Sequence, residues 1–567
     1  MSMKKVVLTA ALAVLMLVSA SASAQTAHYM VFEVDESGRI EPVFYQLVEM
    51  QAPADPARDL PVQQADTDGE IVKYELYLDG KSQGFSYAKL PRMRGEFAKE
   101  PGVDDRIQSV QPGRSGAGAF VIRVAVDTAD TIRFEHGPQP QTYSIESVAA
   151  QRAMLREAAT VPFDIGLPAE HGPPGNRVDL LVLGDGYTGT QKTSFENDAA
   201  NLKNALFAFP PYREYRNFVN WVTLFSPSSQ SGASHPPYQP NCTSASCCSD
   251  PDAQSDPFAG RFTQTAFDST FCTNQIHRLL TVNQSKVLAA AAGYPDWDQI
   301  LVLVNDEVYG GSGGFLSVTS TNQYADQIVL HELGHSFSGL ADEYDTPYPG
   351  LPPCSDTAGG SPCEPNVTNQ TSRSQIKWAS WISPGTAVPT PPGTPGVGLF
   401  EGARYQSTGM YRPVDQCQMR QLGVPFCPVC REQYIRRLYT GGWGTPQDGI
   451  DLIEPGSEQP APEAPVQYTV GTSISFTVDL LWPQESDLDI EWLLDGVPVT
   501  GSWTESFTFS QDTPWPEQRT LELRVRDADT NGYLSDPVSA GLPPHQRTWT
   551  IEVAGELPDE VFHDRFQ

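Results

Sequence analysis

The residues best suited to chemistry lie in one short stretch, His331-Glu-Leu-Gly-His335. Residues four apart on an α-helix share a face, so His331 and His335 can offer two imidazole nitrogens to one metal ion, with Glu332 beside them. Imidazole pairs of this kind bind zinc, and a neighbouring carboxylate can serve as a general base. The stretch therefore predicts a zinc centre with His331 and His335 as ligands and Glu332 as the catalytic residue.

A third protein ligand is expected shortly after this helix, because a catalytic zinc ion usually has three protein ligands and a water molecule. The histidines that follow His335 lie far away in another predicted domain, so a nearby carboxylate is the better candidate. If the helix continued, Asp342 would lie roughly 16 Å beyond His331 along its axis. The chain must turn, and Gly339 can end the helix in the left-handed conformation. Asp342 is the predicted third ligand.

The longer string from His331 to Tyr344, HELGHSFSGLADEY, resembles the zinc motif of the IgA-peptidase metallopeptidases, the igalysins. It is also similar to the metzincin motif, which has two residues between the second histidine and the glycine where this chain has three. The added residue rotates the turn by about 100°, which leaves Glu343 open as an alternative to Asp342. The string Gly-Asp-Gly-Tyr-Thr at 184–188 carries the same resemblance.

This resemblance covers roughly residues 27–440, and it implies a zinc peptidase with its own N-terminal domain. It also implies roles for two later residues. Met419 lies where metzincins place their Met-turn, a methionine that packs beneath the metal without binding it. Some metzincins have a tyrosine two residues after that methionine, where this chain has Gln421. Tyr411 is the predicted substitute as an oxyanion donor.

The glycine-rich segment Gly310-Gly-Ser312-Gly-Gly314 formally matches the G-x-S-x-G pattern of serine hydrolases. That pattern requires a helix directly after the serine, whereas the residues at 315–321 are typical of a strand. We therefore expect the segment to be an edge strand whose backbone can pair with a peptide substrate.

The first 24 residues are typical of a secretory signal peptide, with Lys4 and Lys5, an apolar run and small residues before Gln25. We expect a secreted or periplasmic protein, since no later stretch is apolar enough to span a membrane. The net charge of −32 would repel nucleic acid and anionic membranes, which excludes them as partners. A protein or peptide substrate is expected, and nothing in the sequence indicates an oligomeric state.

All nine cysteines lie between Cys242 and Cys430. Export favours disulfides, and the odd number leaves at least one thiol without an intrachain partner. We expect Cys427 and Cys430 to form a structural disulfide, because no second CxxC motif accompanies them. The loop after the zinc helix holds Cys354 and Cys363, and one disulfide could pin it, but the sequence leaves the pairing open. The acidic loops leave a structural Ca²⁺ open, without a recognisable calcium-loop spacing.

Short alternating strands at both ends of the chain predict β-sandwiches, and strands that alternate with helices in the middle predict an α/β domain. Central strands are expected over 178–183 and 299–304. Helices are expected over about 190–207, 273–292 and 428–439. The fold class is therefore a multidomain chain with an N-terminal β-sandwich, a central α/β metzincin-like zinc peptidase domain and a C-terminal β-sandwich.

The predicted domain boundaries follow these changes in pattern. Trp492, followed by Asp495-Gly496, resembles an immunoglobulin-type sandwich. The division is a signal peptide (1–24), an N-terminal β-sandwich domain (25–160), a metzincin-like catalytic domain (161–445), a Pro/Glu-rich linker (446–465), an immunoglobulin-like β-sandwich (466–555) and a tail (556–567).

Together these features predict a secreted zinc-dependent endopeptidase. Zinc would lower the pKa of its bound water and polarise the scissile carbonyl, while Glu332 takes the proton of the water and passes it to the leaving amine. The resemblance does not identify immunoglobulin A as the substrate. The alternative is an exported cell-surface or matrix binding protein with a structural or degenerate metal site. Glu332 argues against it, because a structural site needs no carboxylate at that position.

Overall fold

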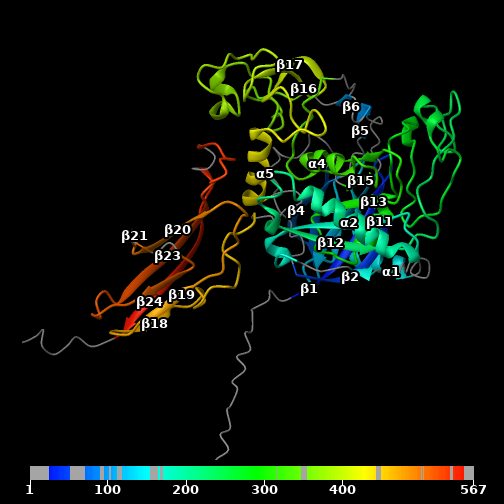
Figure 1. Cartoon of the computed structure of the whole chain (residues 1–567). Helices are drawn as coiled ribbons and strands as arrows, with labels where there is room; N and C mark the ends of the chain where they lie inside the picture. The colour runs from blue at the N-terminus through cyan, green and yellow to red at the C-terminus, as the bar shows by residue number, and fades with distance from the viewer. Residues whose placement is uncertain are drawn as a thin grey trace, which may run out of the picture.

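The computed structural model of the chain contains several β-sheets and few helices, arranged as more than one domain (Figure 1). The residues that it describes are 24–51, 71–89, 95–100, 104–110, 118–153, 164–165, 170–313, 316–345, 354–441, 449–499, 501, 504–536 and 541–554. The predicted signal peptide, apart from its last residue, and the predicted tail lie outside them. In the described part of the chain, no helix combines the length and the apolar character needed to cross a membrane.

The N-terminal region forms two larger sheets that share one core. The first has the order β2-β1-β7 and the second β4-β3-β8-β9, while β5 and β6 form a separate hairpin. Side chains from both larger sheets, Phe32, Phe120 and Phe134 among them, pack into one buried cluster. The elements are β1 (Gln25–Val34), β2 (Ile40–Met50), β3 (Ile71–Leu78), β4 (Lys81–Lys89), β5 (Gly95–Glu100), β6 (Asp104–Val110), β7 (Gly118–Ala125), β8 (Thr131–Phe134), β9 (Gln141–Ser144) and α1 (Ile145–Ala153).

Within the described residues, six strands form the central sheet, in the order β10-β12-β11-β13-β15-β14. The four inner strands are parallel and the two edge strands antiparallel. Every residue of β11 and β13 is buried, as expected of parallel strands that are covered on both faces. The strands are β10 (Asp164–Ile165), β11 (Val178–Asp185), β12 (Val219–Phe225), β13 (Gln299–Val304), β14 (Gly311–Ser312) and β15 (Leu316–Ser320).

Different layers cover the two faces of this sheet. Leu180 and Val182 of β11 pack in one cluster with side chains of α2 (Lys192–Leu206) and α4 (Ala325–Ser336). Leu181 and Leu183 point the other way, into a cluster with β1, β2 and α3 (Gln284–Ala291). The N-terminal sheet therefore packs on the face opposite α4.

The helix predicted over 273–292 is wrong in its first half, because α3 begins only at Gln284. Cys272 has a left-handed backbone conformation and forms a disulfide with Cys248, which fixes the preceding segment as a turn. Asn283 then caps α3, its side chain accepting a hydrogen bond from the Lys286 N–H at 3.1 Å.

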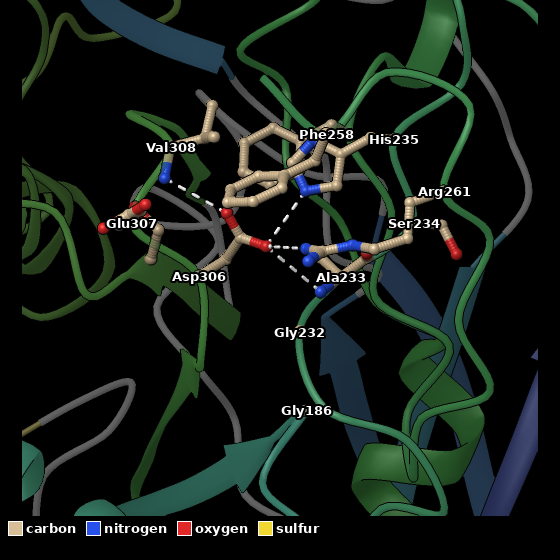
Figure 2. Close-up of polar contacts among 12 residues, drawn as sticks. Gly186, Gly232, Ala233, Ser234, His235, Phe258, Arg261, Asp306, Glu307 and Val308 are labelled. Atoms are coloured by element: carbon tan, nitrogen blue, oxygen red, sulfur yellow. Dashed lines mark hydrogen bonds and ion pairs between the residues drawn. The ribbon is translucent and has the colours of Figure 1, made fainter. Parts of the chain in front are cut away.

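Asp306, just after β13, fastens the long connection between β12 and α3 to the sheet (Figure 2). Its Oδ2 accepts hydrogen bonds from Arg261 Nη2 at 2.6 Å and the Ala233 N–H at 3.2 Å, and lies 2.9 Å from His235 Nε2. His235 Nδ1 lies 2.8 Å from Asp256 Oδ2. The buried imidazole is thus held between two carboxylates.

We expect Asp306→Asn to lower the free energy of unfolding near pH 6 by about 2 kcal/mol, the scale of a hydrogen bond to a charged group. Burial raises the pKa of Asp306, but His235 and two backbone N–H groups outweigh it and lower the pKa. For His235, burial lowers the pKa, but Asp256 and Asp306 outweigh it and raise the pKa.

A carboxylate with a lowered pKa contributes stability that is present above its ordinary pKa near 4 and is lost as the pH falls through the lower folded value. A histidine with a raised pKa contributes below its ordinary pKa and loses that contribution at higher pH. Urea unfolding of the wild type and of Asp306→Asn should therefore show the largest difference in free energy of unfolding between about pH 4 and 6. A difference that persists undiminished below pH 3 would contradict the ion-pair account.

The C-terminal strands form an elongated unit beside α5 (Pro428–Thr440), drawn in orange to red (Figure 1). One sheet has the order β18-β24-β23-β20-β21, and β19 pairs with β22. Trp492 and Trp549 stack in its core with their ring centroids 5.6 Å apart. The strands are β18 (Val466–Thr469), β19 (Ile474–Thr477), β20 (Leu488–Leu494), β21 (Val497–Pro498), β22 (Ser506–Phe509), β23 (Gln518–Asp527) and β24 (His545–Ala554).

The described part of the predicted linker, 449–465, packs against both neighbouring regions. Leu452 and Ile453 are fully buried. Glu454 accepts a hydrogen bond from Arg177 of the central region, and the Pro460 carbonyl accepts one from Trp549 Nε1 at 2.7 Å. The described part of the segment is therefore packed against the central and C-terminal regions that it connects.

Candidate metal centre

Helix α4 carries two histidines on one face and ends where the sequence predicts. It packs against β15 and α2, and its residues from Ile328 to Ser336 are buried. Gly339 adopts a left-handed conformation with a φ of 64°, and the Leu340 N–H donates to the Gly334 carbonyl at 3.0 Å. This closure turns the chain back toward the helix.

The turn brings Asp342 to the two histidines. His331 Nε2 and His335 Nε2 lie 3.1 Å apart, and Asp342 Oδ1 lies 3.3 Å from each of them. Bonds of 2.0–2.1 Å at tetrahedral angles would separate two zinc ligand atoms by about 3.3 Å. The three buried atoms therefore fit three corners of a tetrahedron around one zinc ion.

Backbone carbonyls orient both imidazoles. His331 Nδ1 lies 3.0 Å from the Gln418 carbonyl oxygen, and His335 Nδ1 lies 2.7 Å from that of Leu340. A carbonyl oxygen can only accept, so each Nδ1 carries the proton and each Nε2 keeps its lone pair. Both rings have the tautomer that a metal ligand requires.

Tyr405 supports the carboxylate of the cluster and was missed by the sequence analysis. Its hydroxyl donates to Asp342 Oδ2, and the N–H of the preceding residue, Arg404, donates to the Asp342 carbonyl at 2.9 Å. Tyr405 is 63 positions away from Asp342 in the sequence, so no local spacing could have indicated it.

We expect Tyr405→Phe to weaken metal binding by about 10- to 100-fold, the usual cost of removing a hydrogen bond to a metal ligand. The ring would remain packed against Tyr344, 5.3 Å between centroids, so the fold should be kept. Competition for zinc with a chelator of known affinity measures the effect. Tyr411→Phe is the matched control, because the hydroxyl of Tyr411 interacts with Glu401. Equal zinc affinity of the two variants would contradict the role of Tyr405.

Glu332 follows His331 in α4, and its carboxylate reaches the residue directly after the edge strand β14. A Cβ placed on Gly313, directly after β14, would lie 1.3 Å from Glu332 Oε2. Only glycine leaves room for the carboxylate at this point. Ser312, the serine of the G-x-S-x-G pattern, is buried and donates its hydroxyl to the Leu280 carbonyl at 2.7 Å, which suits a structural role.

Met419 packs directly against the helix that carries the histidines. A Cβ placed on Gly334 would lie 2.5 Å from Met419 Sδ, so the methionine occupies the space that a side chain there would need. Its neighbour Gln418 supplies the carbonyl that orients His331. The predicted Met-turn segment therefore lies beside α4, and its supporting role stays a prediction.

Tyr411 has other partners. It lies in β17 (Gln406–Arg412), which pairs with β16 (Phe400–Ala403), and its N–H donates to the Thr368 carbonyl at 2.9 Å. Burial raises the pKa of its hydroxyl, and Glu401 raises it further. These contacts hold Tyr411 to Thr368 and Glu401, and its oxyanion role stays an untested prediction.

Glu343, the alternative third ligand, points into a second buried cluster with Cys417, Cys427 and Cys430. Its Oε1 accepts a hydrogen bond from Asn366 Nδ2 at 3.0 Å. Burial raises the pKa of the Glu343 carboxyl well above its ordinary value, and Cys417 adds to the increase. The sequence left Asp342 and Glu343 as alternatives for the third ligand, and the structure brings Asp342 to the histidines.

The expected disulfide between Cys427 and Cys430 is not formed, since both cysteines and Cys417 are free. The Cys430 N–H donates to Cys427 Sγ at 3.4 Å, so Cys427 caps the first turn of α5 in place of bonding to Cys430. The loop after α4 is pinned by a disulfide between Cys354 and Cys363, a pairing that the sequence had left open. The disulfides of the described residues are Cys242 with Cys247, Cys248 with Cys272 and Cys354 with Cys363.

A comparison with known families finds a match over the central part of the chain. A sequence model of the family described as IgA Peptidase M64 matches residues 167–249, 245–394 and 392–438. No curated protein matches the chain. A solved structure of a nucleoside hydrolase-related hypothetical protein from Saccharophagus degradans, associated with carbohydrate metabolism, aligns at 10% identity over 66% of this chain and 92% of that one. Its TM-score of 0.15 is too low to support a conclusion about the fold.

Proposed function

Residues 167–438 belong to the IgA peptidase M64 family, and on that premise we propose that the chain is a secreted zinc-dependent endopeptidase. The observation that carries the proposal is the tetrahedral spacing of His331, His335 and Asp342, with Glu332 next to His331 on the same helix. Membership of a peptidase family indicates a metallopeptidase with protein substrates. The identity of the metal, the mechanism and the export are our proposals.

His331, His335 and Asp342 would hold the metal. The Gln418 and Leu340 carbonyls keep both Nε2 atoms directed at one point, and Tyr405 holds the free oxygen of Asp342. A zinc ion bound there supplies a Lewis acid, which lowers the pKa of a water molecule and polarises the peptide carbonyl.

Glu332 is the proposed general base and general acid. Its carboxylate takes a proton from the attacking water as the water oxygen bonds to the carbonyl carbon, and then delivers that proton to the amide nitrogen as the C–N bond breaks. Gly313 keeps the space around this carboxylate clear. The substrate pairing predicted for the edge strand β14 is blocked at Gly311, whose N–H donates to the Arg278 carbonyl and whose carbonyl accepts from the Leu280 N–H, both at 3.2 Å.

Export and the domain architecture are part of the same proposal. Three disulfides are consistent with export, since they form in oxidising compartments. We propose a metzincin-like domain around the central sheet, with β-sandwiches before and after it. The paired sheets at each end of the chain support the sandwich assignment.

Cleavage of casein, an unstructured protein, tests the proposal. The mature chain should cleave casein, lose the activity when a zinc chelator is added, and regain it when zinc is restored. His331→Ala should be inactive in all three conditions. Undiminished cleavage after complete metal removal would refute the metallopeptidase. If the zinc-loaded chain cleaves neither casein nor a panel of other unfolded proteins, the exported binding protein becomes the better assignment.

A further inference from the structure

We propose that Glu343, Cys417, Cys427 and Cys430 form a second metal site, a structural zinc centre beside the first. All four residues are buried, and one ligand atom of each lies within 4.8 Å of the others. The inference goes beyond the peptidase function and does not depend on it, because it concerns how the chain is held together.

The spacing of the sulfur atoms fits a shared metal ion better than a disulfide. Cys417 Sγ and Cys430 Sγ lie 3.7 Å apart. Zinc–sulfur bonds of 2.3 Å at tetrahedral angles would separate two sulfur atoms by about 3.8 Å. A disulfide requires about 2.05 Å. Cys430 Sγ also lies 3.3 Å from Glu343 Oε1, near the separation of about 3.5 Å expected for a sulfur and an oxygen ligand of one zinc ion.

The number of thiols supports the same conclusion. Six cysteines in the middle of the chain form three disulfides, and the remaining three gather in this one place. A disulfide between any two of them would leave the third thiol buried beside a buried carboxylate. One metal ion could bind all three sulfur atoms as ligands.

The surroundings of the cluster are those of metal-bound thiolates. The Cys427 N–H donates to Cys417 Sγ at 3.3 Å, and the Cys430 N–H donates to Cys427 Sγ at 3.4 Å. Such hydrogen bonds stabilise sulfur ligands and fix their direction. Asn366 orients Glu343 through Oε1, whereas the buried Oε2 receives no hydrogen bond from the described residues. A metal ion bound by both oxygens of the carboxylate would satisfy Oε2 as well.

The ligand types indicate which metal binds. Three soft sulfur ligands and one carboxylate suit zinc and disfavour calcium and magnesium, which take oxygen ligands. Three thiolates and a carboxylate exceed the charge of one Zn²⁺, and a guanidinium lies nearby. Arg420 donates Nη1 to the Glu343 carbonyl at 2.9 Å.

The second site would clamp the segments that shape the first. Glu343 follows Asp342 directly, and its N–H donates to the Met419 carbonyl at 2.8 Å. Cys417 precedes the Met-turn segment, and Cys427 and Cys430 lie at the start of α5. A metal ion would therefore join the loop after α4, the Met-turn segment and α5 at one point.

Metal counting and cobalt spectroscopy on the purified mature chain test the inference. We expect two zinc ions per chain after dialysis, one for each cluster. With Co²⁺ in place of zinc, the second site should give a strong thiolate-to-cobalt charge-transfer band, which the first site cannot give because it contains no sulfur. His331→Ala should retain that band and one zinc ion.

Variants of the second cluster complete the test. Cys417→Ser and Glu343→Gln should each lower the zinc content by up to one ion and weaken or remove the band. Cys354→Ser is the matched control, since Cys354 belongs to a disulfide, and it should leave the band unchanged.

If a variant does not fold, the number of reactive thiols in the wild-type chain still tests the proposal. In the denatured, metal-free protein three cysteines should react with a thiol reagent without prior reduction. One zinc ion without a thiolate band, or only one reactive thiol, would overturn the proposal.

Discussion

Glu332→Gln is expected to abolish peptide-bond cleavage while zinc remains bound. The amide cannot take a proton from water, and a positioned general base contributes roughly 10²- to 10⁴-fold to a rate. Glutamine has nearly the same shape as glutamate, so it fits the space beside Gly313 and leaves His331 and His335 in place. Cleavage of casein and the zinc content of the same preparation are the two measurements.

Asp326→Asn provides a control on the same helix. Asp326 lies in the first turn of α4 and contacts Gln327, away from the ligand atoms, so its loss of charge should leave the cleavage rate close to that of the wild type. If Glu332→Gln cleaves at a comparable rate, the carboxylate is not the base. If Glu332→Gln loses zinc, its loss of activity says nothing about proton transfer. In that case the metal site depends on Glu332, and our assignment of Glu332 as a base that does not bind the metal is wrong.

Asp342→Ala is expected to empty the histidine site. Two imidazoles alone form an incomplete set, because a catalytic zinc takes three protein ligands. The variant also leaves the buried Tyr405 hydroxyl without its carboxylate. We expect zinc affinity at this site to fall by well over the 10- to 100-fold that follows loss of an outer hydrogen bond. The variant should also be inactive.

Glu401→Ala is the matched control, because Glu401 is an acidic residue that interacts with Tyr411 and with the Gly409 N–H. It should bind zinc as the wild type does. Cobalt-loaded Asp342→Ala should keep the thiolate band of the second cluster, which distinguishes loss of the first metal from general unfolding. If Asp342→Ala keeps zinc at the histidines and only Glu343→Ala empties that site, then Asp342 is not the ligand.

Much of the fold follows from local pattern in the sequence. Continuous apolar runs predict the parallel strands β11 and β13, and the spacing of charged and apolar residues predicts α2 and α5 to within a few residues. The prediction failed before α3, where the disulfide of Cys272 and the Asn283 cap override the helical propensity of the segment. Long-range constraints of that kind cannot be read from neighbouring residues.

Part of the candidate site follows from local sequence pattern, and the rest depends on tertiary contacts. His331, Glu332 and His335 follow from helical spacing, and Gly339 indicates the turn that brings Asp342 back. The contacts of Tyr405 and Gly313 with this cluster depend on tertiary packing. The cysteine pattern misled the prediction, because a CxxC motif by itself does not reveal a third cysteine ten positions upstream or the carboxylate of Glu343, 87 positions from Cys430.

The adjacent carboxylates of Asp342 and Glu343 limit how this region can be redesigned. One belongs to the histidine cluster and the other to the cysteine cluster, so the register of the chain after His335 serves two sites at once. Shortening or lengthening the segment 336–341 by one residue would displace both carboxylates together. A loop transplanted from a protein with the shorter metzincin spacing would therefore have to be accompanied by changes around the cysteines, even though those cysteines lie about 80 positions away.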